Sequence, residues 1–164
     1  MATTPVYLEI GEKSVFAVAL DWPGWCRRAK TGDLALGELE RYRSRYATIV
    51  TGRFTRGSIE VVGTVAGNRT TDFGAPSAIS EWDLSPLADT ELGRLAGLLA
   101  DCWDYFERAV TIVPAQLRKG PRGGGRDRDA MVDHVREAER AYASKLGVRI
   151  PQGLRHPSNA PPSC

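Results

Sequence analysis

Residues 118–128 combine positive charge with glycine at a spacing that suits the binding of an anion. The cations of this segment, named the basic loop below, are Arg118, Lys119, Arg122, Arg126 and Arg128. Three successive glycines, residues 123–125, give the backbone access to positive φ angles and remove side chains that would hold a ligand at a distance. The pattern that follows predicts the start of a helix, whose unpaired N–H groups and dipole also favour negative charge. The loop is therefore a candidate anion site.

Two side chains of the predicted helix extend this site. An imidazole at His134, at the edge of the apolar stripe, could act as an acid, a base or a single ligand, and Tyr142 would close the wall. The alternatives are a solvent-exposed connector and a boundary histidine bonded to a neighbouring helix. We predict no metal and no cofactor. The predicted ligand-binding residues are Arg118, Lys119, Arg122, Gly123, Gly124, Gly125, Arg126, His134 and Tyr142.

The composition limits the classes of partner. A length of 164 residues suits one domain or two small ones, and 42% hydrophobic with 26% charged residues is typical of a globular protein. The net charge of +2 gives no overall field towards nucleic acid, which is therefore not an expected partner. Neither a signal-peptide pattern nor an apolar run of membrane-spanning length is visible, which predicts a cytoplasmic protein without a membrane partner.

The three cysteines match neither a disulfide framework nor a zinc pattern, so a reducing cytoplasm is the simplest setting. They are Cys26, Cys102 and Cys164. Cys26 lies beside Arg27 and Arg28, which could lower the pKa of its thiol and make it a nucleophile. A catalytic thiol normally needs a base within hydrogen-bond reach, and the sequence identifies none.

The N-terminal residues show the pattern of a strand hairpin. Residues 6–10 and 15–20 are β-rich runs separated by four residues, which indicates an antiparallel pair. Trp22 and Trp25 then flank a Pro-Gly turn. We expect both rings to be buried between sheet and helix, because aromatic side chains dominate core energetics.

A helix and a further strand follow the turn. Thr31 or Asp33 can cap a helix that runs to about Val50, and residues 58–66 resume strand character. The apolar positions of the helix follow the rhythm of one buried face. They are Ala35, Leu39, Tyr42, Tyr46 and Ile49.

The second half of the chain predicts two long helices. One begins near Asp89 and ends before Pro114, and the other runs from about Asp127 to Leu146, where Gly147 ends it. A helical turn near Ser80 is expected in the connector before them.

These elements predict an α+β fold, with a small antiparallel sheet and one helix, followed by a pair of long antiparallel helices. The predicted organisation is a sheet-plus-helix unit over 1–66, a connector over 67–88, a helical hairpin over 89–148 and an irregular or disordered tail over 149–164.

Residues 6–50 resemble HicB-type domains. The resemblance is carried by the strand hairpin, the segment ALDWPGW with Pro23 and Gly24, and the capped amphipathic helix. It implies a small, partly open α+β fold. Many such domains are the antitoxin half of a toxin–antitoxin pair, so it also implies a regulatory protein with a toxin partner.

Residues 89–147 are similar to part of a DinB-like helical bundle. The matching features are the aromatic-rich helix around Trp103, the glycine-rich loop, and His134 followed by Glu and an aromatic residue. The family commonly holds a divalent metal with three histidines, and only His134 matches one of those positions. The resemblance implies a transferase or isomerase without the full triad, or with a metal shared across a homodimer that completes four helices.

The residues themselves favour a non-catalytic binding module over an enzyme. Its expected partner is a small anionic ligand or an acidic protein surface, held by charge-assisted hydrogen bonds from the basic loop. The DinB-like transferase or isomerase, the HicB-like antitoxin and a homodimer stay open as alternatives.

Overall fold

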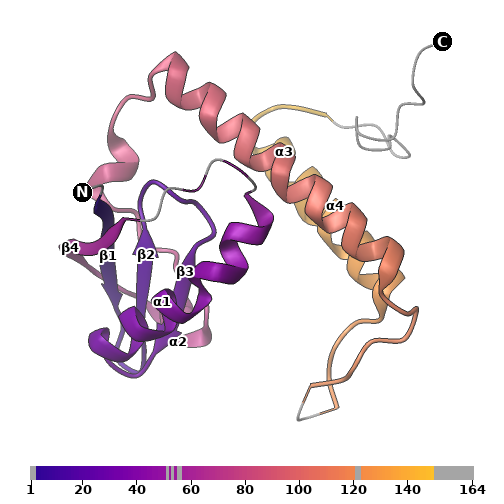
Figure 1. The fold of residues 1–164 in the computed structure, drawn as a ribbon, viewed down its shortest axis with the longest axis horizontal. Helices are drawn as coiled ribbons and strands as arrows, with labels where there is room; N and C mark the ends of the chain where they lie inside the picture. The colour runs from indigo at the N-terminus through magenta and orange to yellow at the C-terminus, as the bar shows by residue number, and fades with distance from the viewer. Residues whose placement is uncertain (1–2, 51, 53, 55–56, 121–122, 150–164) are drawn as a thin grey trace. The chain divides into compact units, whose positions relative to one another are not determined.

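The chain divides into two compact units, Met1–Asp101 and Cys102–Cys164. The first holds a four-stranded sheet with its helices, and the second holds a helical hairpin (Figure 1). The predicted α+β class is confirmed. The predicted tail beyond Arg149 lies outside the described residues. This computed structural model describes residues 3–50, 52, 54, 57–120 and 123–149.

Four strands form one mixed sheet in the order β3-β2-β1-β4. They are β1 (Thr3–Ile10), β2 (Val15–Ala19), β3 (Cys26–Ala29) and β4 (Ser58–Ala66). β1 and β2 form the predicted antiparallel hairpin, and β3 continues the antiparallel pairing on β2. β4 pairs with β1 in parallel, which corrects the expectation of an antiparallel sheet at this one pairing.

The parallel pairing of β4 follows from the helix that precedes it. α1 (Gly32–Ile49) connects β3 to β4 and packs against β2 and β3. A helical crossover returns the chain to the end of the sheet from which it started, so β4 runs in the same direction as β3. Two antiparallel pairings separate β3 from β1, and β1 therefore shares that direction too.

Thr31, one of the two predicted caps, precedes α1, and the helix buries three residues of the predicted stripe and partly buries the other two, Tyr42 and Ile49. The side-chain oxygen of Thr31 accepts a hydrogen bond from the Leu34 N–H and so satisfies a first-turn donor. Ala35, Leu39 and Tyr46 are buried, at the spacing of one helical face.

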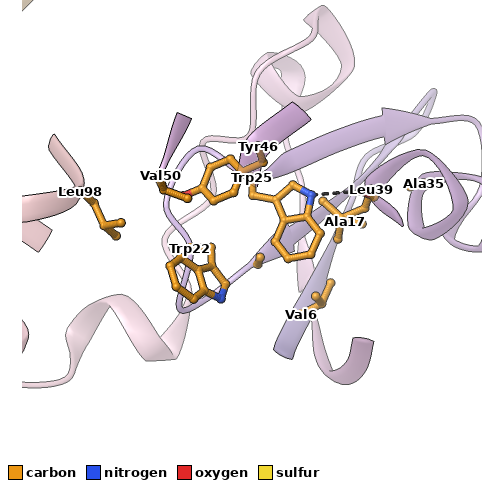
Figure 2. Packing of buried hydrophobic residues seen from close by; sticks show 10 residues of the cluster. Val6, Ala17, Trp22, Trp25, Ala35, Leu39, Tyr46, Val50 and Leu98 are labelled. Carbon is orange, nitrogen blue, oxygen red and sulfur yellow. Dashed lines mark hydrogen bonds between the residues drawn. The ribbon is translucent and has the colours of Figure 1, made fainter. Parts of the chain in front are cut away.

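Trp25 forms the centre of the core, and Trp22 is also buried, as predicted. The Trp25 Nε1–H donates to the Leu39 carbonyl oxygen at 3.0 Å, so the polar edge of the ring is satisfied inside the core (Figure 2). Tyr46 stacks on Trp25 with ring centroids 5.8 Å apart, and its hydroxyl donates to the Pro23 carbonyl oxygen at 2.9 Å. These two hydrogen bonds fasten the Pro-Gly turn to α1.

The predicted connector over residues 67–88 contains more structure than expected. It forms a short helix, α2 (Arg69–Phe73), and a 3₁₀ helix, η1 (Glu81–Leu84). η1 begins at Ser80, where a helical turn was predicted, and the Ser80 and Asp83 side chains cap it reciprocally.

This segment packs on the sheet face that lies opposite α1. Side chains alternate along a strand, so Tyr7 points away from the face where Val6 joins the core under α1. The Tyr7 ring stacks on Trp82 with centroids 5.6 Å apart. Burial, with smaller contributions from the Glu9 and Asp83 carboxylates, raises the pKa of Tyr7 to about 12.

The second unit is a helical hairpin of α4 (Arg128–Lys145) and the last residues of α3 (Asp89–Ile112). Residues 102–112 run antiparallel to α4, because the Trp103 Nε1–H donates to Glu139 at 2.7 Å while Arg128 donates to the Val113 carbonyl oxygen at 3.4 Å. No residue of α4 is buried. Among the described residues, no helix is both long and apolar enough to cross a membrane.

Candidate anion-binding site

Backbone hydrogen bonds fold the basic loop back on itself. The Gly120 N–H donates to the Gly124 carbonyl oxygen at 2.8 Å, and the Gly123 N–H donates to the Gly120 carbonyl oxygen at 2.9 Å. Gly123 and Gly125 have φ angles of 73° and 133°, in the region that favours glycine. The predicted need for glycine is therefore met at two of the three positions 123–125, and the cluster forms a tight turn.

Asp127 determines the charge at the base of the loop. Its Oδ1 accepts hydrogen bonds from Lys119 Nζ at 2.6 Å and from the Leu117 N–H at 3.2 Å. The Lys119 bond first, and the Leu117 bond second, lower the pKa of this carboxyl below its ordinary value. Asp127 stands at the N-cap of α4 but makes no side-chain capping bond. The first turn of α4 consequently lacks a side-chain cap, although the Arg128 N–H donates to the Ala115 carbonyl oxygen at 3.0 Å.

The remaining cations of the loop divide into two kinds. Arg128 is engaged, because it pairs with Asp129 at 2.8 Å. Arg118 and Arg126 are exposed and form no ion pair with any residue that the structure describes. Arg122 lies outside the described residues. The guanidinium groups of Arg118 and Arg126 are thus available to an acceptor, whereas the Lys119 ammonium group is already paired with Asp127.

The structure does not bring all the predicted site residues together. His134 is exposed on α4 and stands seven residues beyond Asp127, which is about 10 Å along the helix axis. Tyr142 stands fifteen residues beyond Asp127, about 22 Å along the axis. Its ring is 68% exposed and lies near the Lys145 ammonium group, 5.6 Å from the ring centroid. Tyr142 is therefore too distant to form a wall for the basic loop, and of the two predicted wall residues only His134 lies in the first half of α4.

The structure describes no cluster of metal ligands. Within the described ranges, no three His, Cys, Asp or Glu side chains gather closely enough to hold a metal ion. The histidine of the DinB-like resemblance, His134, lies on the exposed side of α4.

Cys26 does not have the environment of an activated thiol. Burial raises the pKa of the Cys26 thiol, and the neighbouring Arg27 lowers it by less, so the pKa lies above its ordinary value. A higher pKa leaves less of the nucleophilic thiolate at neutral pH. The hypothesis that the adjacent arginines activate this thiol is therefore corrected.

The basic loop lines neither of two cavities that the structure shows in the first unit. One, of about 510 Å³, opens between α1 and the start of β4, and the other, of about 410 Å³, opens beside α2. Small ligands usually occupy concave sites that enclose most of their surface. The basic loop instead presents its charge on an exposed turn.

Sequence reasoning missed a buried carboxylate in the sheet. Glu9 is fully buried and accepts hydrogen bonds from the Thr71 hydroxyl, the Ser77 N–H at 3.1 Å and the Ala78 N–H at 3.3 Å. A signal was available, since Glu9 is the single charged residue among the apolar and aromatic residues 6–10. The three donors engage both carboxyl oxygens and fix residues 71–78 to β1, which indicates a structural role for Glu9.

No protein-family model matches the chain, and no curated protein or solved structure shows a significant match to it. The HicB-like and DinB-like resemblances accordingly stay predictions from their motifs.

Proposed function

We propose that this protein is a non-catalytic binding module that engages an acidic protein surface through the basic loop. The observation that carries the proposal is the arrangement around Asp127. Its carboxylate bonds Lys119 and Leu117 rather than the helix, which leaves α4 without a side-chain cap beside the exposed Arg118 and Arg126. Uncapped helix N–H groups and free guanidinium groups are both donors for carboxylates.

The shape of the loop favours a protein surface over a small anion. The described residues 118–120 and 123–126 are exposed, the loop is hydrogen-bonded within itself, and these residues line neither described cavity. An exposed cationic turn can contact an acidic patch on a partner, where the partner supplies the complementary surface. A free phosphate or nucleotide would keep most of its hydration on such a turn.

The test is the affinity for an acidic probe. We expect Arg118→Ala/Arg126→Ala to weaken the binding of a fluorescein-labelled polyglutamate peptide about tenfold, because two exposed charge pairs contribute about 1–2 kcal/mol together. Fluorescence anisotropy at low and at physiological salt measures this change. Inorganic phosphate, used as a competitor, reports whether the site prefers a small anion.

The matched control is Arg108→Ala/Arg136→Ala, which removes the same charge from exposed positions on α3 and α4. We expect it to bind the peptide within about twofold of the wild type, by long-range electrostatics alone. Equal losses in both double variants would show that net charge, and not the loop, binds the peptide. Displacement by millimolar phosphate would contradict the preference for a protein surface.

A second candidate function is a HicB-like antitoxin or regulator. It is favoured by the packing of residues 6–50, where the Pro-Gly turn is fastened to α1 through Pro23 and Trp25. The segment that carries the resemblance thus forms a single packed unit. Co-purification of a small basic partner that depends on this unit, and not on Arg118 or Arg126, would support this candidate over the first.

A further inference from the structure

The two edge strands of the sheet differ in their protection against pairing with another strand. β3 is only four residues long and carries Arg27 and Arg28. Arg27 lies over the Tyr42 ring, and Arg28 donates to the Phe73 carbonyl oxygen at 3.4 Å. Short length and charged side chains are the usual means by which proteins protect a sheet edge. β3 is therefore a protected edge.

β4 has little of this protection. It is nine residues long, ends the strand order of the sheet, and contains Glu60 as its single charged residue, with neither lysine nor proline. Val61 and Val62 are 45% and 42% exposed. One irregularity is present, because Val6 of β1 faces Val61 whereas Tyr7 faces Gly63. This bulge lies at the middle of β4 and leaves a regular stretch on each side of it.

A groove runs beside the unprotected edge. α1 packs on β2 and β3, and the cavity of about 510 Å³ opens between α1 and the first residues of β4. Ala47 and Phe54 form apolar parts of its lining, together with Ile59 of β4. A strand added to the outer edge of β4 would place alternate side chains over this groove.

We propose that the outer edge of β4 pairs with β4 of a second copy of this chain, antiparallel and about a two-fold axis near the middle of the strand. The two sheets would join into one continuous sheet of two copies. A two-fold axis places the same strand on both sides of the contact, so the side chains of β4 must be compatible with those of an identical antiparallel strand.

The charge pattern of β4 fits such self-pairing. With the axis near the strand centre, Glu60 falls opposite one of residues 64–66 of the second copy, which are Thr, Val and Ala. The two Glu60 side chains are then kept apart, and like charges opposite each other would be unfavourable. In the register that places Glu60 opposite Val65, Ala66 of the second copy falls opposite Ile59, on the sheet face that carries the apolar groove. An unrelated extended peptide has no such reason to match β4.

The test measures the mass of the full chain in solution. Sedimentation equilibrium of the wild type is expected to give twice the chain mass of 17.9 kDa at micromolar concentration. Val61→Lys places a charge on the exposed edge and is expected to weaken dimerisation at least tenfold. Leu34→Lys, at a similarly exposed position on α1, is the control and is expected to dimerise like the wild type.

Hydrogen exchange of the wild type decides the matter even if Val61→Lys fails to fold. Amides of β4 are expected to be protected at high protein concentration and to exchange faster on dilution. Amides of β3 are expected to exchange at a rate that does not depend on protein concentration. A monomeric wild type, an unchanged dimer in folded Val61→Lys, equal weakening by Leu34→Lys, or β4 protection that is independent of concentration would each overturn the proposal. None of these measurements depends on the basic loop, so a failure here leaves the proposed function standing.

Discussion

The sheet unit and the helical hairpin place their aromatic side chains in different environments. Trp25 is fully buried and its indole N–H bonds a backbone oxygen inside the core. Trp103 is half-buried and bonds the side chain of Glu139 on a helix that has no buried residue. The comparison teaches that the first unit holds itself together by burial, whereas the second presents polar and charged groups to the surroundings. A loop that recognises a partner is therefore expected in the second unit.

The largest expected effect separates the two tryptophans. Trp25→Ala is expected to lower the free energy of unfolding by about 3–5 kcal/mol, because it removes a fully buried ring and its hydrogen bond. Trp103→Ala, at a ring that is only partly buried, is expected to cost about 1–2 kcal/mol. Urea denaturation followed by circular dichroism measures both. Equal losses would mean that the hairpin is packed as tightly as the sheet unit.

An intermediate effect is expected at Glu9. Glu9→Gln replaces an acceptor of three hydrogen bonds by an amide whose NH₂ group would face donors, which is expected to cost about 1–3 kcal/mol. Glu12→Gln, at an exposed position in the adjacent turn, is expected to change stability by less than about 0.5 kcal/mol. Chemical denaturation of both variants is the measurement. Indistinguishable midpoints would show that Glu9 does not hold residues 71–78 on the sheet.

The smallest expected effect concerns the titration of Asp127. Its pKa in the folded protein is expected to lie below the ordinary value of 3.8, and Lys119→Ala is expected to raise it. A carboxyl with a lowered folded pKa contributes stability above its unfolded pKa, and that contribution is lost as the pH falls through the folded pKa. A carbon-detected NMR titration of the Asp127 carboxyl measures the pKa directly. No change on replacing Lys119 would contradict the ion pair in the basic loop.

Elements with a strong apolar rhythm could be predicted from the sequence, and those created by pairing could not. β4 has its predicted limits, and α1 follows its predicted cap Thr31 and buries three residues of the predicted stripe. β3 was not predicted, because the residues Cys-Arg-Arg-Ala have no alternation of apolar and polar side chains. Its strand conformation comes from pairing with β2, a tertiary effect that a local pattern does not contain.

The site could be located from the sequence only in part. The cations and glycines of the basic loop mark the position of the site. The rise per residue of a helix would by itself have excluded Tyr142 from the site, because it places Tyr142 too far along the helix from the loop. The sequence could not show that the Asp127 carboxylate bonds Lys119 instead of capping the N–H groups of α4, because this choice depends on how the loop folds back.

The central claim is that the basic loop recognises an acidic surface, and chemical-shift mapping tests it most directly. Titration of the ¹⁵N-labelled full chain with a polyglutamate peptide is predicted to shift the amides of residues 117–130, with the guanidinium resonances of Arg118 and Arg126 among the strongly shifted signals. Amides of β1 and β2 are predicted to stay in place. Shifts that concentrate on the sheet unit, or an absence of shifts in the loop at saturating peptide, would contradict the account.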